Sequence, residues 1–379
     1  MYAAKTLACL VLVSCVGVSH GAITVGTCES TKHPYQTISA AIAAAPANSV
    51  VDVCPGTYPE QLAITKPLTI RGVLSGVNIV PPSTGLTAFP ANSDIYPQIF
   101  VNAKGAVALS NLSLNGNARG IRTPGGLLSL AAACQDGQLG DYAAVYFLNT
   151  PGAVEHLNIS GYFVSGFAPG DPEPQFIPNC GSGIEFIDAS DAIVRNTVIG
   201  ETGLYGIYST GDLTADRNVV SGGFGPYGVG IMSGSDGTIT ENTITGTLRY
   251  RDTVGIQGGN LVRGNVVQSV LIGIAGASKV RHNTMLNNAV GLSRIGEAAD
   301  NLITAPSTYM DPTCQNFSCG NFGVKPTIGI DVACESASSM KDNGIVGVGI
   351  GFANVEAGQT ISPTDLFANV TTKSTICTP

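Results

Sequence analysis

One short phrase recurs through the stretch from Ala192 to Ile303 and limits what this chain can fold into. The phrase is apolar-x-x-Asn-x-apolar, and it occurs with steps of 22, 24, 23, 18 and 18 residues at Asn196, Asn218, Asn242, Asn265, Asn283 and Asn301. A second phrase, Gly followed by Ile or Leu, keeps step with it at Gly183, Gly206, Gly230, Gly255, Gly273 and Gly291. A period of about twenty residues in short β-branched runs is typical of a solenoid of strands. We therefore expect an all-β fold, a single-stranded parallel β-helix whose coils pair as parallel strands.

The recurring asparagines have a structural explanation. Asn tolerates the left-handed turn conformation, and its amide can donate to one neighbouring coil while accepting from the other. Such a ladder suits a turn inside the stack, so we expect these residues to be structural. Extended backward, the same column reaches Asn111 and His156, and we expect this histidine to satisfy neighbouring turn groups.

Composition fits one elongated domain. The chain has 379 residues, of which 12% are charged and 48 are Gly, and it has no Trp. These values fit stacked coils with tight turns. The formal net charge of −8 disfavours nucleic acid and anionic membrane as partners. A local cluster of arginines can still bind an acidic polysaccharide. We expect a monomer.

The first residues are typical of an export signal. Lys5 precedes the apolar run from Thr6 to Val13, and small residues follow up to Ala22, so we expect residues 1–22 to be a cleaved signal peptide and residues 23–379 to be the folded domain. No other apolar run is long enough to span a membrane. The interpretation is a secreted or periplasmic protein. The segment Leu12-Val-Ser-Cys15 also matches a lipobox, which makes a lipid anchor at Cys15 the alternative.

Eight cysteines follow the signal, and an even number in an exported chain predicts disulfides. Pairing by sequence proximity gives Cys28 with Cys54 and Cys134 with Cys180, and leaves Cys314, Cys319, Cys334 and Cys377 to pair among themselves. The sequence does not fix this connectivity. We expect no metal at Cys314 and Cys319, because no second pair of ligands with a His accompanies them.

A short helix is predicted ahead of the first coil. In the segment from Thr37 to Pro46, the residues Ile38, Ala41, Ile42 and Ala45 lie on one helical stripe, with Thr37 as N-cap. A cap of this kind covers the first coil of a solenoid and prevents end-to-end association. We assign the cap to residues 28–46, the coils to residues 50–335 approximately, and a less regular C-terminal segment to residues 336–379.

The segments that follow the helix resemble a known family. The runs Tyr35-Gln-Thr-Ile-Ser-Ala-Ala-Ile42, Val53-Cys-Pro-Gly-Thr-Tyr-Pro-Glu60 and Lys66-Pro-Leu-Thr-Ile-Arg-Gly72 are similar to the opening of pectin-lyase-like right-handed β-helix proteins, including pectin methylesterases. The likeness covers about forty residues closely and implies the right-handed fold, which the crossover rule for parallel strands also favours. It does not identify an activity. Within this motif we expect Glu60 to be structural.

Long inserts interrupt the rungs. They span residues 81–98, 123–141, 161–181 and 304–326, with a shorter one at 248–253. Insertions in a solenoid map to turns and often gather on one flank, where ligands bind.

The motifs of two enzyme classes that share this fold are absent. The later pectin methylesterase segments, among them Gly-Arg-Pro-Trp, have no counterpart in a chain without Trp. The Asn-Thr-Asp, Asp-Asp, Gly-His-Gly and Arg-Ile-Lys segments of polygalacturonases are also missing. Esterase and hydrolase activities of those two families are therefore disfavoured.

Proton removal beside a uronate carboxylate needs a base and a group that neutralises the acid. The insert before Gly255 supplies Arg249, Tyr250, Arg251 and Asp252. Three residues that follow the Gly-Ile phrase, Glu185, Tyr208 and Gln257, should point outward on one sheet near this insert. The hypothesis is a lyase or epimerase with Arg251, Asp252, Tyr208 and Glu185 as catalytic residues and Arg249, Tyr250 and Gln257 as substrate contacts. An alternative explanation is that Arg251 and Asp252 form an ion pair in a solvated turn.

Calcium is the cofactor that pectate lyases commonly use, and it needs several carboxylates in one place. Asp188 and Asp191 are close in sequence, but their turn positions explain them equally well. The second functional hypothesis is a non-catalytic surface or adhesion scaffold that binds glycan along its long sheet. A catalytic protein should have a deep cleft beside residues 249–252, whereas a scaffold should have a shallow strip of aromatic and amide side chains.

Overall fold

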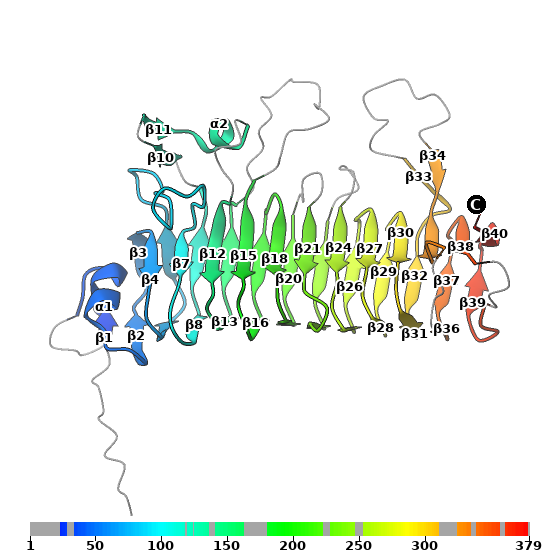
Figure 1. The fold of residues 1–379 in the computed structure, drawn as a ribbon, viewed down its shortest axis with the longest axis horizontal. Coiled ribbons are helices and arrows are strands. Elements are labelled where there is room, and N and C mark those ends of the chain that lie inside the picture. The colour runs from blue at the N-terminus through cyan, green and yellow to red at the C-terminus, as the bar shows by residue number, and fades with distance from the viewer. Residues whose placement is uncertain are drawn as a thin grey trace, which may run out of the picture.

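The chain folds into a right-handed parallel β-helix with three long sheets (Figure 1). The computed structural model describes residues 23–28, 34–117, 120–123, 125–135, 141–162, 180–222, 228–246, 253–310, 324–334, 339–356 and 361–377. Each sheet has 12 strands in this part of the chain, and successive coils contribute one strand to each sheet. This architecture confirms the predicted fold class.

The strands of the three sheets are as follows. Sheet A contains β1 (Ile23–Val25), β2 (Ser49–Val53), β5 (Leu68–Gly72), β8 (Val107–Ser110), β13 (Gly152–Glu155), β16 (Ala192–Arg195), β19 (Leu213–Asp216), β22 (Thr238–Thr240), β25 (Leu261–Arg263), β28 (Lys279–Arg281), β31 (Glu297–Ala299) and β36 (Ser339–Lys341). Sheet B contains β3 (Gly56–Pro59), β6 (Val77–Val80), β9 (Ser113–Asn115), β14 (Asn158–Ser160), β17 (Val198–Gly200), β20 (Val219–Ser221), β23 (Thr243–Thr245), β26 (Val266–Gln268), β29 (Thr284–Leu286), β32 (Leu302–Thr304), β37 (Gly344–Val346) and β39 (Leu366–Ala368). Sheet C contains β4 (Leu62–Ile64), β7 (Ile99–Val101), β12 (Ala143–Leu148), β15 (Ser182–Ile187), β18 (Tyr205–Ser209), β21 (Val229–Met232), β24 (Val254–Gln257), β27 (Ile272–Ala275), β30 (Val290–Ser293), β35 (Ile328–Asp331), β38 (Ile350–Val355) and β40 (Thr372–Ile376).

The Gly-Ile phrase lies in sheet C and faces the interior. The isoleucines of this phrase are fully buried and stack in register, as Ile184 does on Ile207. The glycine is required by close packing, since a Cβ at Gly183 would lie 2.4 Å from the Gly206 carbonyl oxygen and 2.8 Å from the Ile199 side chain. The column therefore lets neighbouring coils approach at the spacing of a parallel sheet.

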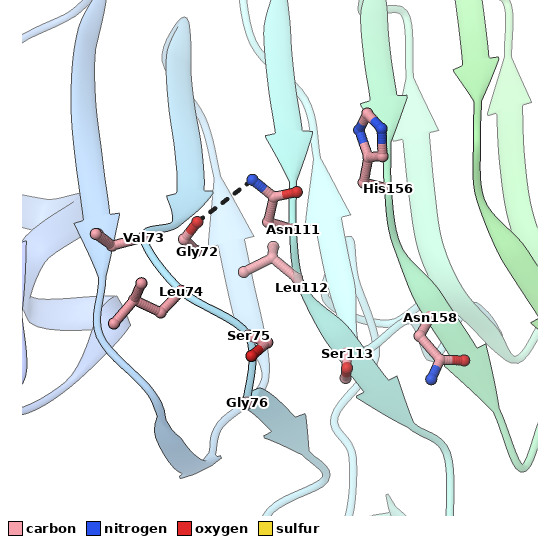
Figure 2. A pocket seen from close by; sticks show the side chains of 10 residues that line it. All are labelled: Gly72, Val73, Leu74, Ser75, Gly76, Asn111, Leu112, Ser113, His156 and Asn158. Carbon is pink, nitrogen blue, oxygen red and sulfur yellow. Dashed lines mark hydrogen bonds between the residues drawn. The ribbon is translucent and has the colours of Figure 1, made fainter.

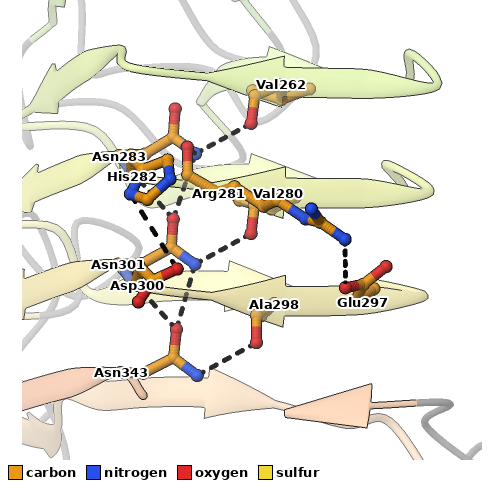
Figure 3. Close-up of polar contacts among 10 residues, drawn as sticks. All are labelled: Val262, Val280, Arg281, His282, Asn283, Glu297, Ala298, Asp300, Asn301 and Asn343. Carbon is orange, nitrogen blue, oxygen red and sulfur yellow. Dashed lines mark hydrogen bonds and ion pairs between the residues drawn. The ribbon is translucent and has the colours of Figure 1, made fainter. Parts of the chain in front are cut away.

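Buried asparagines form the expected ladder at the corner between sheets A and B (Figure 3). Each amide donates to the side-chain oxygen of the next coil at 2.9–3.0 Å and to a backbone carbonyl of the preceding coil at 2.9–3.2 Å. The members are Asn218, Asn242, Asn265, Asn283, Asn301 and Asn343, and Asp365 accepts at the end. Because every donor finds an acceptor, the ladder satisfies a buried turn.

Three residues that the sequence assigned to the ladder column lie one position before it in their coils. Sheet A pairs Arg195 with Asp216, so Asn196 aligns with Arg217, and Thr197 aligns with the ladder residue Asn218. Asn196 (φ 49°), like Asn111 and His156 (both φ 56°), occupies the left-handed corner that precedes the ladder. The assignment was wrong because Asn suits both positions. His156 is exposed and does not join the ladder.

The predicted cap is confirmed. Helix α1 spans Ile38–Ala44, and the Thr37 side chain accepts from the Ala40 amide as N-cap. Glu60 accepts from the Ile38 and Ser39 amides at 2.8 and 2.9 Å. A carboxylate at this end also interacts favourably with the helix dipole, so Glu60 is structural as expected.

The inserts leave the coil at a single corner. All five connect a strand of sheet B to the next strand of sheet C, for example β9 to β12 and β23 to β24. Their described parts include the hairpin of β10 (Ile121–Thr123) and β11 (Gly126–Leu128), helix α2 (Leu130–Gln135), and the pair β33 (Thr308–Met310) and β34 (Val324–Pro326). These elements lie on the same side of the coil (Figure 1), as predicted.

Three disulfides are present among the described cysteines. Cys28 bonds to Cys54, Cys134 to Cys180 and Cys334 to Cys377. The first two pairs are those expected from proximity, while Cys314 and Cys319 lie outside the described residues. The segment expected to be irregular carries five more strands, β36 to β40, which continue all three sheets to Ile376. That expectation was wrong because Met340-Lys-Asp-Asn-Gly-Ile345 repeats the Asn phrase, and Asn343 continues the ladder.

The predicted signal peptide with Cys15 lies outside the described residues. Neither α1 nor α2 has the length or the apolar character that a membrane-spanning helix needs, in the part of the chain that the structure describes.

Candidate functional site

The outward face of sheet C carries two of the predicted site residues side by side. Glu185 on β15 pairs in register with Tyr208 on β18, at the strand spacing of about 4.8 Å. Gln257 on β24 lies two strands further along the same column, beyond Met232. In the other direction the column continues to Tyr146 and Phe100. Arg249, Tyr250, Arg251 and Asp252 lie outside the described residues, so their roles stay predictions.

Glu185 is the chemically unusual member of this column. Its side chain is 1% exposed, and its Oε1 has no hydrogen-bond partner among the described residues. Burial, and secondarily the charge of Asp141, raise its pKa to about 8, although a hydrogen bond with Ser182 opposes the shift. Because burial disfavours the charged form, Glu185 is a neutral acid at pH 7 and can donate a proton or a hydrogen bond.

Two further acids belong to the same neighbourhood, and sequence reasoning missed both. Burial, followed by the charge of Asp94, raises the pKa of Asp141 above its ordinary range. The Asp141 amide donates to the Asp94 carbonyl at 3.2 Å, which ties the end of the second insert to the first. No spacing rule connects residues 94, 141 and 185. The only available signal was that Asp94 and Asp141 lie in inserts that precede strands of sheet C.

Aromatic rings flank the acids on both sides. Phe100 stacks between Phe89 and Tyr146, with ring centroids 5.5 and 6.3 Å apart. These residues form a small apolar cluster that is separate from the main core. Beyond Glu185, Tyr205 stacks on Tyr208 at 4.5 Å. We call Phe100, Tyr146, Glu185, Tyr208 and Gln257 the sheet C strip.

The tyrosines of the strip are hydrogen-bond donors at neutral pH. Burial raises the pKa of Tyr146, and the charges of Asp141 and Glu185 add to this effect. Burial and the charge of Glu185 likewise raise the pKa of Tyr208. Both phenols therefore keep their protons, and Tyr208 does not supply a preformed base. Phe100, Tyr146 and Glu185 are buried, whereas Tyr208 and Gln257 are partly exposed. The exposed part of the strip therefore offers one ring and one amide, which suit the face and the hydroxyls of a sugar.

The described residues do not gather a cation site. No group of three or more His, Cys, Asp or Glu side chains among them could hold a metal ion. Asp188 and Asp191 have φ of 49° and 57° and occupy left-handed turn positions. Calcium dependence is left to experiment.

Comparisons with known proteins support the fold. A sequence model described as a right-handed β-helix region matches residues 175–305, and a second, of a protein family of unknown function, matches residues 24–85. The chain thus has the right-handed β-helix fold that its opening resembles. No curated protein sequence matches the chain at a significant level.

Similar solved structures have low sequence identity to this chain. The A-module of mannuronan C-5 epimerase AlgE4 from Azotobacter vinelandii is 13% identical, with a TM-score of 0.48, over 90% of this chain and 92% of that one. An exopolygalacturonase of family 28 from Yersinia enterocolitica is 10% identical, with a TM-score of 0.46, over 94% and 78%. Pectin methylesterase PemA from Erwinia chrysanthemi is 12% identical, with a TM-score of 0.42, over 91% and 92%. At this similarity they carry no inference about activity.

Proposed function

We propose that this protein is exported and acts on an acidic polysaccharide, which lies along the sheet C strip and undergoes elimination or epimerisation at a uronate residue. The observation that carries the proposal is Glu185, a buried acid beside Tyr146 and Tyr208 that is protonated at pH 7 and whose Oε1 has no hydrogen-bond partner among the described residues. The disulfides favour an oxidising compartment such as the periplasm or the exterior. Cys15 as a lipid anchor is the alternative to soluble export.

A neutral carboxylic acid suits a uronate substrate. Removal of the proton beside the uronate carboxylate places negative charge on the carboxylate oxygens, and a donor aimed at them stabilises the transition state. The Glu185 O–H group is such a donor, and its bond to an anionic oxygen is of the strong, charge-assisted kind. The phenol of Tyr208, in the adjacent strand, supplies a second donor. Arg251 is kept as the candidate base, with Asp252 beside it and Arg249, Tyr250 and Gln257 as candidate contacts.

The aromatic strip also favours a second function. Rings and an amide on one sheet can bind a glycan without any reaction, and the partly exposed Tyr205, Tyr208 and Gln257 fit that description. In this alternative the protein is a glycan-binding or adhesion scaffold, and Glu185 contributes a hydrogen bond alone.

The test is to incubate the mature protein with a panel of uronic-acid polymers, with and without calcium. Absorbance near 232 nm detects the unsaturated product of elimination, and proton NMR of the polymer detects epimerisation. We expect one of these signals in the wild type and at least a hundredfold loss in Glu185→Gln, since the amide is a weaker donor to an anionic oxygen than the carboxylic acid and cannot share its proton with it. The control is Glu241→Gln, at an exposed turn away from sheet C. Binding without either signal establishes the scaffold, and an unimpaired Glu185→Gln enzyme removes Glu185 from the mechanism.

A further inference from the structure

A hollow of about 400 Å³ lies at the corner between sheets A and B, where the first coils turn (Figure 2). No residue that lines it comes from sheet C. The side chains and backbone around it belong to three successive turns and to the strands that follow them, at Gly72, Val73, Leu74, Ser75, Gly76, Asn111, Leu112, Ser113, His156 and Asn158. We call it the corner hollow.

Unequal turn lengths create the hollow. Four residues, Val73–Gly76, join β5 to β6, whereas two residues join β8 to β9 and β13 to β14. The long turn therefore projects beyond the two tight turns beside it. Gly72 allows the turn between β8 and β9 to pack closely against the end of β5, because a Cβ at Gly72 would lie 2.1 Å from the Asn111 carbonyl oxygen. At the far end of the long turn, Gly76 has φ of 93°, a conformation that favours glycine.

The lining is polar but carries no Lys, Arg, Asp or Glu. The exposed side chains of Asn158, His156 and Ser75 offer hydrogen-bond donors and acceptors. Among the described residues, Asn111 donates to the Gly72 carbonyl oxygen at 3.4 Å, and its side-chain oxygen accepts no hydrogen bond. Leu74 adds an apolar surface that is 58% exposed. Asn158 and Asn78 both pair in register with Ser113, so the polar row continues along sheet B.

We propose that the corner hollow binds a neutral sugar residue of a glycan. Without Lys or Arg the hollow has no permanent cation to neutralise a phosphate or uronate, and without carboxylates it does not hold a metal ion. Amide, imidazole and hydroxyl groups beside one leucine match the hydroxyls and C–H face of a hexose. The volume is at the lower end of the ~300–1,000 Å³ usual for ligand pockets, which suits one sugar unit. The assignment does not depend on the reaction proposed for sheet C.

The test uses four neutral trisaccharides as probes: cellotriose, maltotriose, mannotriose and galactotriose. Saturation-transfer NMR detects binding to the wild-type protein, and isothermal titration measures its affinity, for which we expect a Kd of ~1 mM from few contacts. We expect at least tenfold weaker binding in Asn158→Ala, which removes polar partners, and in Ser75→Phe, which fills the hollow. Both positions are exposed, so both variants should fold.

Two control variants separate this site from the sheet C strip. Val198→Ala changes the next residue of the Asn158 column, outside the hollow, and Glu185→Gln changes the proposed reaction. Neither should alter trisaccharide binding. The proposal is overturned if none of the probes binds, or if binding persists in both hollow variants. Loss of binding in Glu185→Gln, with normal binding by the hollow variants, would place the sugar on sheet C instead.

Discussion

The two halves of the solenoid close the same corner in different ways. From Asn218 to Asn343 the corner between sheets A and B is a buried amide ladder with one strand register. In the earlier coils Leu112 and Leu157 occupy the corresponding positions, and stacked rings such as Phe147 on Phe186, with centroids 4.4 Å apart, fill the core on the sheet C side. Thr197 lies at the junction between the two halves, and its backbone N–H donates a hydrogen bond to the side-chain oxygen of Asn218.

This difference places most of the candidate site outside the stabilising ladder, although Gln257 and the predicted residues 249–252 lie within the ladder half. In the ladder half each coil repeats a fixed set of hydrogen bonds, which leaves little room for variation. The apolar corner of the early half does not require a matching side chain in the next coil, because leucine side chains have no polar groups that need hydrogen-bond partners. That half holds Glu185, the two inserts that supply Asp94 and Asp141, the disulfide between Cys134 and Cys180, and the corner hollow. Departures from local regularity are expected at functional sites.

The largest expected effect comes from breaking the ladder. In Asn265→Ala the backbone amide and side chain of Asn242 lose their acceptor, and the Ile239 carbonyl loses its donor. Each buried group left without a partner costs about 1–3 kcal/mol, so we expect a loss of about 4 kcal/mol in the free energy of unfolding. Denaturation in guanidinium measures it, with Asn260→Ala, at an exposed position of the same coil, as control. Equal midpoints for the two variants would show that the ladder is not a stabilising element.

Disulfides offer a second comparison of the two halves. Replacing Cys134 and Cys180 by Ala should cost about 3 kcal/mol, and the same pair of changes at Cys334 and Cys377 should cost a similar amount. The two double variants should differ in activity. Cys180 lies two residues before the first residue of β15, the strand that carries Glu185, so the first double variant should lose activity at temperatures where it is still folded. If both double variants keep full activity, the first disulfide has no part in shaping the site.

The pH dependence of stability tests the state of Glu185. Its pKa is raised from 4.5 to about 8 in the folded protein, so the unfolded chain releases this proton first as pH rises. Wild-type stability should therefore fall between pH 4.5 and 8, and the loss that Glu185 causes approaches ~1.4 kcal/mol per pH unit. Glu185→Gln should lack this component. Guanidinium midpoints of both proteins at pH 5, 6 and 7 measure the growing difference, and parallel curves would mean that Glu185 ionises normally.

Much of the fold could be predicted because two separate sequence motifs recur with the same period. The Gly-Ile phrase and the Asn phrase must both be in step for neighbouring coils to pair, so their shared period predicts parallel stacking. The exact column could not be predicted at Asn196, because Asn suits both the left-handed corner and the ladder beside it. Only the pairing of Arg195 with Asp216 distinguishes the two positions.

The candidate site was predictable in part. Glu185 and Tyr208 share a face because each follows the Gly-Ile phrase, and this spacing is local. Asp94 and Asp141 approach from inserts, and nothing in the sequence gives the path of an insert through space. The burial that raises the pKa of Glu185 is also a property of the assembled structure, since an isolated strand would expose the side chain to water.

The smallest expected effect comes from extending the ladder into the early half. Thr197→Asn places an amide in register with Asn218 at nearly constant volume. Its oxygen can accept from the Leu157 amide, which now donates to the Thr197 hydroxyl at 3.3 Å, and its NH₂ group can donate to the side-chain oxygen of Asn218. One added hydrogen bond is worth about 1 kcal/mol, and the loss of the threonine methyl contact offsets part of it, so we expect a gain below 1 kcal/mol. The measurement is the guanidinium midpoint, with Thr197→Val as the control that removes the hydroxyl. A gain for Thr197→Asn over the wild type would show that the early coils can accept the ladder, whereas a loss would show that they do not accept its geometry.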